Sequence, residues 1–401
     1  MTDTSPGTSP GTSPGTSPGT AADTAPDGSV PAVASAGAPV ERVRTLVWQI
    51  PTEDPEADAT LAWDSTTVVL AEIDAGGRTG LGWTYGDRAA ATVIDGRLAS
   101  VLTGRDALRP GQAYDAMLGA CRNLGTPGVA ATAVSAVDCA LWDLKARLLG
   151  VPLVTLLDGV HEAVPVYGSG GFTTLSPSAT AEQLSGWVAA GIPRVKLKVG
   201  GDPDADPARV RAARSAIGPD TALYADANGG WHRKQALYWA QRLREPDADI
   251  TWLEEPVSSE DLAGLRLLRD RGPGGMDIAA GEYGWDVPYF QRMLDAGAVD
   301  CLQADVTRCG GITGFLRVAA LCDARCVDLS AHCAPQLSAH ACTAVWHLRH
   351  LEYFHDHVRI ERMLFDGVLE PEAGGVLRPD RSRPGHGLTL APGRADRHRI
   401  A

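Results

Sequence analysis

The chain has 401 residues, of which 44% are hydrophobic, so it can bury a barrel of roughly 250 residues and a second domain. Its formal net charge of −13 argues against nucleic acid or an anionic membrane as a partner. No segment is apolar for the roughly 18 residues of a membrane span, and no basic leader opens the chain. Eight cysteines without a CxxC motif favour reduced thiols. We therefore expect a cytoplasmic protein.

Residues 1–39 are a Thr-Ser-Pro-Gly repeat followed by a Pro/Ala/Gly-rich stretch. They have almost nothing to bury, so we expect a disordered tail. Three strands are expected between Val40 and Tyr85. The polar segment 51–63, between the first two strands, is longer than a hairpin turn needs and is expected to be a loop. A helix should follow, because apolar side chains recur at steps of three and four: Val134, Val137, Leu141, Leu144 and Leu148.

Beyond Val164 the pattern changes to short apolar strands that alternate with helical segments. This alternation is typical of a parallel α/β barrel. From residue 364 the chain is rich in Gly and Pro, and it is expected to pack back on the N-terminal domain. The predicted barrel strands are 164–167, 195–199, 222–226, 250–254, 276–281, 300–303, 327–330 and 349–353.

Four ionisable side chains recur every 28 residues: Lys198, Asp226, Glu254 and Glu282. A (β/α)8 barrel repeats strand, loop and helix at about that interval and gathers its chemistry where the strands end. Three carboxylates meeting there would repel one another without a cation. Because these candidate ligands are all carboxylates, Asp226, Glu254 and Glu282 are expected to hold Mg²⁺. The alternative is a set of ordinary salt bridges at the strand ends.

The neighbours Glu254 and Glu255 compete for one of these ligand positions. Successive side chains on a strand point to opposite faces, so only one of the two is expected to face inward. The 28-residue interval favours Glu254. Glu255 is then expected to support the site from outside the ligand set, with a lysine as a candidate partner.

Two candidate bases are also predicted. Lys196 and Lys198 lie on one face of a buried strand, where proximity to each other and to a metal lowers a lysine pKa and lets one lysine act as a base. Asp305 precedes His332 by 27 residues, which places the pair on the next two barrel strands. A carboxylate on one imidazole nitrogen raises the basicity of the other, so His332 is expected to be a second base, remote from Lys198. The alternatives are a solvated lysine pair and a structural histidine.

Four further polar residues are candidates for contact with a substrate. Glu352, if held protonated, would donate a hydrogen bond to an oxyanion; the alternative is a surface glutamate. The Asn228 amide is close enough in sequence to the metal ligands to reach a metal-bound substrate hydroxyl. His355 and His357 line either the pocket mouth or an exposed loop, and both interpretations stay open.

Six short motifs together resemble the enolase superfamily, specifically its mandelate racemase-like branch, over nearly the whole chain from Val40. Each motif alone is weak, but the combination is highly specific. The motifs are Ala-Val-Asp-Cys-Ala-Leu-Trp-Asp-Leu (136–144), Lys-Leu-Lys (196–198), Asp-Ala-Asn (226–228), Leu-Glu-Glu-Pro (253–256), Ala-Gly-Glu (280–282) and the pair Asp305 and His332.

The resemblance implies a modified (β/α)7β barrel with an α+β capping domain built from both ends of the chain. On that basis residues 40–162 and 364–401 should form the capping domain and residues 163–363 the barrel. It also implies Mg²⁺ on the three carboxylates, Lys198 as a base, and Lys196 and Glu352 in contact with the substrate carboxylate. Relatives of this kind suggest a symmetric homo-oligomer, with an octamer as one option.

The implied reaction is removal of the proton α to a carboxylate through an enediolate intermediate. Dehydration of a sugar acid, an aldonate or aldarate, to a 2-keto-3-deoxy product is the expected outcome. A racemase or epimerase of a 2-hydroxy acid is the first alternative, and a non-catalytic metal- and ligand-binding barrel is the second. The expected partner is a small-molecule carboxylate, whose identity would be read by a mobile loop at 51–63.

Overall fold

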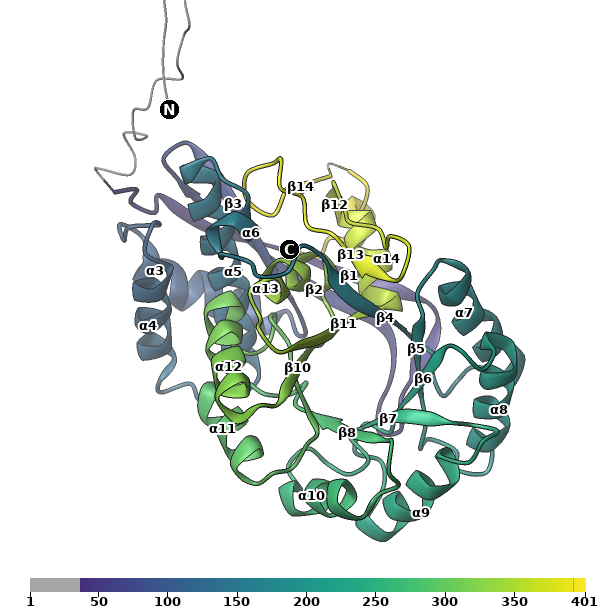
Figure 1. The fold of residues 1–401 in the computed structure, drawn as a ribbon. Coiled ribbons are helices and arrows are strands. Elements are labelled where there is room, and N and C mark those ends of the chain that lie inside the picture. Colours follow the sequence, from purple (N-terminus) through teal and green to yellow (C-terminus); the bar gives the residue numbers. More distant parts are fainter. Residues whose placement is uncertain (1–36, 392) are drawn as a thin grey trace, which may run out of the picture.

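The computed structural model describes residues 37–391 and 393–401 (Figure 1). Residues 1–36 of the expected tail therefore lie outside the described part. The end of that tail differs from the expectation, because Ala38 is buried and its amide donates to Asp106 Oδ1 at 3.0 Å. The carbonyl of Ala38 also accepts from Ala107 at 2.7 Å. Order thus begins before Val40.

The N-terminal part forms an antiparallel sheet in the order β1-β2-β3, covered by helices. Helix α5 lies against β3, and Gly80 and Gly82 permit this close approach, since a Cβ at either position would collide with the α5 backbone. The elements are β1 (Arg42–Ala57), β2 (Ala62–Ala75), β3 (Arg78–Tyr85), α2 (Ala89–Val93), a π-helical turn (Ile94–Leu98), α3 (Ala99–Leu102), α4 (Pro110–Cys121), α5 (Val129–Leu149) and α6 (Leu153–Leu156).

The segment 51–63 is strand rather than the expected long loop. β1 and β2 stay paired beyond Pro51, with a register shift before Glu56, and only residues 58–61 form the turn. Asp58 closes that turn by accepting hydrogen bonds from the amides at 60 and 61. Trp63 donates to Glu56 across the two strands at 2.8 Å. Its polar composition predicted a loop. An extended ribbon at the edge of a sheet can be equally polar, so composition alone does not distinguish the two.

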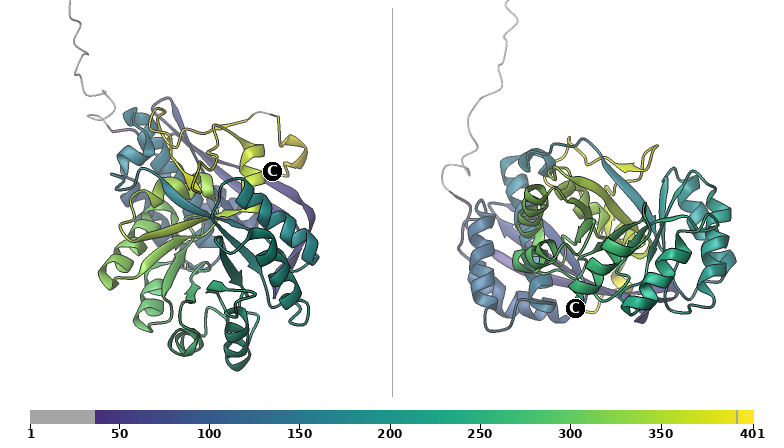
Figure 2. Two further views of the ribbon diagram at one scale, coloured as in Figure 1. Left: turned by 45° about the vertical axis from the view of Figure 1, so that its right-hand side comes forward. Right: turned by 60° about the horizontal axis from the view of Figure 1, so that its bottom comes forward.

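Eight parallel strands form a closed barrel, because β11 pairs with β4 (Figures 1 and 2). A helix follows each of the first seven strands, which confirms the predicted (β/α)7β barrel with an antiparallel capping sheet. The strands are β4 (Val164–Ser169), β5 (Arg194–Lys198), β6 (Ala222–Asp226), β7 (Ile250–Glu254), β8 (Asp277–Ala280), β9 (Cys301–Ala304), β10 (Asp328–Ala331) and β11 (Leu348–Phe354). The helices are α7 (Pro177–Ala189), α8 (Asp206–Ile217), α9 (Arg233–Leu243), α10 (Leu262–Arg271), α11 (Val287–Asp295), α12 (Gly311–Arg325) and α13 (Pro335–Cys342).

The C-terminal segment contacts both the cap and the barrel. β13 adds an antiparallel strand to β4, Ile400 donates to Val47 of β1 at 2.8 Å, and Leu153 donates to Gly385 at 2.7 Å. Helix α14 (His355–Leu364) follows β11 directly, and the segment beyond it contains β12 (Phe365–Asp366), β13 (Val376–Leu377), β14 (Thr389–Leu390) and a 3₁₀ turn (Asp396–His398).

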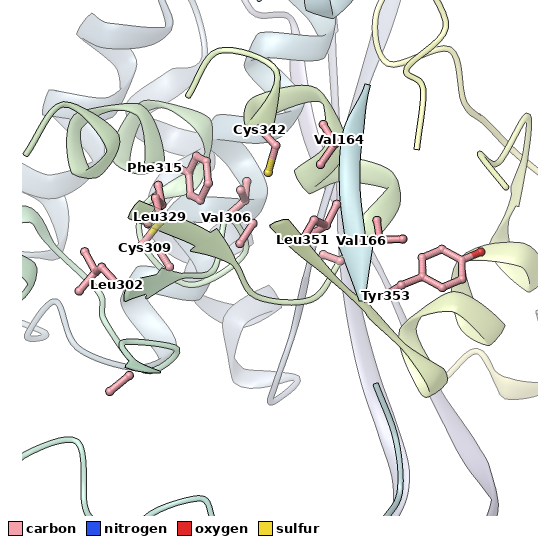
Figure 3. Close-up of a cluster of buried hydrophobic side chains, with 14 of the residues drawn as sticks. Val164, Val166, Leu302, Val306, Cys309, Phe315, Leu329, Cys342, Leu351 and Tyr353 are labelled. Carbon is pink, nitrogen blue, oxygen red and sulfur yellow. The ribbon is translucent and has the colours of Figure 1, made fainter. Parts of the chain in front are cut away.

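Apolar side chains fill the space between the barrel strands and the surrounding helices, as Figure 3 shows for β9, β10, β11 and β4. A second, separate cluster of buried side chains comes from the barrel strands and includes Tyr167, Tyr224 and Trp252. This cluster contacts the candidate site, because Trp252 Nε1 donates to Glu254 Oε2 at 3.2 Å. In the described ranges, no helix has both the length and the apolar character required for a membrane crossing.

Candidate active site

Strand register brings the charged residues of neighbouring strands together. Lys198 on β5 lies opposite Asp226 on β6, and Asp226 lies opposite Glu254 on β7. Each of these residues ends its strand, so the three side chains project from one end of the barrel. Oxygens of Asp226, Glu254 and Glu282 all lie within 4.8 Å of one another, and the three residues are buried.

Glu282 joins this group through a turn and not through strand register. Glu254 lies opposite Ala279, and β8 ends at Ala280, two residues before Glu282. Gly281 makes the turn with φ +133°, and a Cβ there would collide with the carbonyl of Gln303. The Ala-Gly-Glu motif therefore needs its glycine to bring the glutamate to the site.

The three carboxylates fit a hard divalent cation. Oε1 of Glu254 is buried and has no hydrogen-bond partner among the described residues. Burial, followed by the neighbouring Asp226 carboxylate, raises the pKa of Glu254 to about 8, so the charged form is disfavoured without a cation. An all-oxygen donor set of this kind suits Mg²⁺.

Both lysines are ion-paired, and this differs from the expected lowered pKa. Lys198 Nζ lies 2.6 Å from Asp226 Oδ2, and Lys196 Nζ lies 2.7 Å from Glu254 Oε2 and 2.9 Å from Glu352 Oε1. Burial alone would lower the pKa of each lysine, but the carboxylates outweigh it and raise both. Lys198 reaches the cavity, whereas Lys196 is 0% exposed and lies behind the carboxylates.

Asp305 and His332 form a hydrogen-bonded pair just after β9 and β10. Nδ1 of His332 lies 2.7 Å from Asp305 Oδ2, and Thr307 donates two hydrogen bonds to the other oxygen of Asp305. Nε2 of His332 is directed toward Glu282 Oε2 at 3.0 Å. Burial opposes protonation, but the surrounding anionic groups raise the pKa of His332, which favours the imidazolium.

The surroundings of Glu352 favour the carboxylate and not the expected protonated acid. Burial alone would raise its pKa, but Lys196 at 2.9 Å, followed by His332 at 3.4 Å, lowers it below the usual value. The sequence could not reveal this, because both cations come from other strands. Glu352 lines the cavity and is buried, which excludes the surface interpretation.

Glu255 and Asn228 both follow strand ends in the left-handed region, with φ of +39° and +42°. Glu255 lies beyond the end of β7 and is buried, so the alternation of strand faces does not decide its direction. After burial, Glu282 and Asp226 contribute most to raising its pKa. Within the described chain, no lysine forms an ion pair with Glu255. Asn228 lines the cavity, and its Oδ1 has no hydrogen-bond partner there.

A cavity of about 320 Å³ opens above these residues, and the cap supplies much of its wall. His357 lines it and stacks on Tyr85 with ring centroids 3.4 Å apart, so His357 belongs to the pocket. His355 begins α14 and instead pairs with Glu53 at 3.1 Å. The cap residues in the wall are Asp58, Leu61, Trp63, Ser65, Thr66, Thr67, Tyr85 and Gly86.

Sequence reasoning missed Cys333, which also lines the cavity. The sequence offers one signal for it, its place directly after His332. It adopts φ +50°, and its Sγ lies 3.3 Å from both His332 Nε2 and Glu352 Oε2. All eight cysteines are free thiols, and Cys326 alone is exposed.

The fold and the site define a capped TIM-like barrel with an acidic centre at the carboxyl ends of its strands. Residues 42–158 match the mandelate racemase/muconate lactonizing enzyme N-terminal domain, and residues 179–394 match the enolase C-terminal domain-like family. The chain therefore belongs to the mandelate racemase/muconate lactonizing enzyme family of the enolase superfamily.

Two curated relatives have different activities. The chain is 34% identical to 3,6-anhydro-alpha-L-galactonate cycloisomerase of Streptomyces coelicolor, covering 88% of this chain and 97% of the relative. It is 30% identical to L-talarate/galactarate dehydratase of Salmonella typhimurium, covering 89% and 90%. The relatives thus include a cycloisomerase and a dehydratase of acid sugars.

Two solved structures show the same fold. A mandelate racemase/muconate lactonizing enzyme-like protein from Rubrobacter xylanophilus has 58% identity and a TM-score of 0.88, covering 90% of this chain and all of that one. An enolase from Bradyrhizobium, complexed with magnesium and mandelic acid, has 30% identity and a TM-score of 0.81, covering 91% and 99%. Structural relatives therefore bind magnesium, and one of them binds it together with a small carboxylate.

Proposed function

We propose that this protein abstracts the proton α to a carboxylate and dehydrates a sugar acid to a 2-keto-3-deoxy product. One observation supports this most strongly: Lys198 and His332 line the same cavity from β5 and from the end of β10. The strands that carry the three carboxylates lie between them in the barrel order. Two proton-transfer groups thus face one substrate position beside an acidic centre.

In this proposal, different residues carry out the successive proton transfers of the reaction. Neutral Lys198 takes the proton from the α-carbon, and the electron pair of that C–H bond moves into the carboxylate. His332, held as imidazolium, gives its proton to the β-hydroxyl as the C–O bond breaks, so that water leaves. The resulting enol then tautomerises: a proton is added at the β-carbon, the hydroxyl at the α-carbon loses its proton, and the 2-keto acid results. Positioned acid–base groups of this kind contribute about 10² to 10⁴ in rate.

The remaining side chains bind or orient. Asp226, Glu254 and Glu282 would hold Mg²⁺, which stabilises negative charge on the substrate carboxylate and offsets the charge that raises the pKa of Lys198. Asn228 contacts a substrate hydroxyl from the cavity wall. Lys196 is buried, so its proposed role is to hold Glu254 and Glu352 in place.

Racemisation or epimerisation of a 2-hydroxy acid is the second candidate. Its specific support is the same pair of bases, because one can remove a proton from the α-carbon and the other can return it on the opposite face. The Bradyrhizobium structure with magnesium and mandelic acid, a 2-hydroxy acid, adds to it. This outcome needs no leaving group at the β-carbon.

A panel of sugar acids, incubated with the protein and Mg²⁺, separates these candidates. A 2-keto-3-deoxy product supports dehydration, and deuterium uptake at the α-carbon without a keto product supports racemisation. If neither occurs, a ligand-binding barrel is favoured. Lys198→Ala and His332→Asn should abolish turnover while calorimetry still detects Mg²⁺ binding, and the exposed His347→Asn is the matched control. Full activity of either site variant would contradict its role.

A further inference from the structure

A second group of possible metal ligands adjoins the three carboxylates: His332, Cys333 and Glu352. All three are buried and line the cavity. Successive residues on a strand would point to opposite faces. Here β10 has ended, and Cys333 and Ala334 adopt φ of +50° and +44°, so Cys333 faces the cavity beside His332.

The spacing of the three donor atoms matches a tetrahedral metal site. Sγ of Cys333 lies 3.3 Å from His332 Nε2 and 3.3 Å from Glu352 Oε2, and these two atoms are 3.4 Å apart. Metal–ligand bonds of about 2.0–2.3 Å at tetrahedral angles separate the ligand atoms by about 3.3–3.6 Å. The donors therefore need to move by only a few tenths of an ångström.

The chemistry of this donor set differs from that of the carboxylates. One imidazole nitrogen, one thiol sulfur and one carboxylate oxygen suit Zn²⁺, Co²⁺ or Cd²⁺, whereas an all-oxygen set suits Mg²⁺. Burial raises the pKa of the Cys333 thiol, so the metal-free residue stays protonated. A coordinated cation would displace that proton and the Nε2 proton of the His332 imidazolium, and both would be released to solvent. Three protein ligands facing an open cavity leave the fourth position to water.

We propose that His332, Cys333 and Glu352 form a binding site for a thiophilic divalent ion, separate from the magnesium ligands, and that this ion inactivates the enzyme. Coordination through Nε2 occupies the atom with which His332 would move a proton. Inhibition therefore rests on the proposed function, but binding does not. The two sites adjoin where His332 Nε2 lies 3.0 Å from Glu282 Oε2.

Cadmium binding in the presence of excess Mg²⁺ tests the site directly. The parent protein carries Cys326→Ser, which removes the exposed thiol. Titration with Cd²⁺ should produce a sulfur-to-cadmium charge-transfer band that saturates at one ion per chain. Adding Cys333→Ser, which keeps the volume but replaces the soft ligand, should abolish the band, with circular dichroism checking that the variant is folded.

The outcomes distinguish this inference from the proposed function. A band in the parent that is lost with Cys333→Ser supports the site, even if no acid is turned over. No band in the parent, or a band that survives Cys333→Ser, overturns it, as does displacement of Cd²⁺ by millimolar Mg²⁺. Where turnover is measured, saturating Cd²⁺ should lower the turnover rate of the parent at least tenfold relative to its rate without Cd²⁺. The turnover rate of the Cys333→Ser variant should resist this inhibition. Equal inhibition of both proteins would overturn the inactivating role.

Discussion

Asp305 holds His332 through the 2.7 Å contact between Oδ2 and Nδ1, and Thr307 donates two hydrogen bonds to the other carboxylate oxygen. The orientation of the histidine is therefore fixed, with Nε2 facing the cavity. At the scale of single residues, charge states in this site are set by neighbours of this kind. The pKa of the fully buried Lys196, for example, is raised because the side chain contacts Glu254 and Glu352.

Asp305→Asn should lower kcat/KM by about 10²- to 10⁴-fold. The uncharged asparagine would no longer stabilise the imidazolium, so His332 would give a proton to the departing β-hydroxyl less readily. Steady-state kinetics with the acid identified by the panel would measure this loss. Mg²⁺ affinity should stay within a few-fold by calorimetry, because Asp305 is not among the three ligands. Thr307→Val removes one hydrogen bond to Asp305 but keeps its charge, so it should lose much less activity. An equal loss in both variants would contradict the role given to the Asp305 charge.

At the scale of elements, turns after the strands decide which side chains reach the centre. Asp226 and Glu254 arrive by strand register, but Glu282 depends on the turn at Gly281. The 28-residue interval therefore has two structural origins, although it looks uniform in the sequence. The same effect brings Cys333 to the cavity through consecutive left-handed residues.

Gly281→Ala should destabilise the protein by about 1–3 kcal/mol and weaken Mg²⁺ binding. The added Cβ meets the Gln303 carbonyl, and φ of +133° is strained for alanine, so the turn must shift and carry Glu282 away. Chemical denaturation and calorimetry would measure the two effects. Gly274→Ala is the control, since a Cβ there meets no atom within 4 Å. Unchanged Mg²⁺ affinity in Gly281→Ala would contradict this account of the turn.

The β1–β2 ribbon forms part of the cavity wall, and its composition predicts substrate preference. It presents Asp58, Thr66 and Thr67 together with apolar Leu61 and Trp63. In the described part of the chain, the ribbon adds no cationic side chain to the cavity lining.

We therefore expect monocarboxylates to be preferred over dicarboxylates of the same chain length, by at least about tenfold in kcat/KM. A second carboxylate would face Asp58 without a free cation, because Lys198 and Arg308 already lie beside Asp226 and Glu282. Paired assays of an aldonate and the matching aldarate measure the ratio. A higher kcat/KM for the diacid would show that another group neutralises its far end.

At the scale of the whole molecule, buried acids join the cap to the rest of the chain. Glu361 on α14 accepts hydrogen bonds from Trp83 and Tyr85 of β3, both at 3.1 Å. Asp138 on α5 accepts two hydrogen bonds from Thr313 on α12, at 2.7 and 2.8 Å. These contacts connect β3 with α14 and α5 with α12.

The free energy of unfolding should fall as pH rises, and Glu361 should account for part of the slope. Burial raises the pKa of Glu361 from 4.5 to about 8, so between these values the folded protein holds a proton that the unfolded chain has lost. This contribution to the free energy of unfolding is fully present below about pH 4.5. It is lost as the pH rises through about 8, by up to about 1.4 kcal/mol per pH unit. Urea denaturation of metal-free protein at pH 5, 6.5 and 8 should show a shallower slope in Glu361→Gln. The exposed Glu162→Gln should leave the slope unchanged.

The sequence by itself determined the barrel, its capping sheet and the positions of the ionisable residues, because strand and helix periodicity and the recurrence of strand ends are local properties of the chain. It did not determine the ribbon at 51–63, the charges of Lys198 and Glu352, the inward turn of Cys333, or the cap's share of the cavity wall. These features depend on side chains and backbone turns that meet only after folding. Register, burial and ion pairing between distant segments therefore decided them.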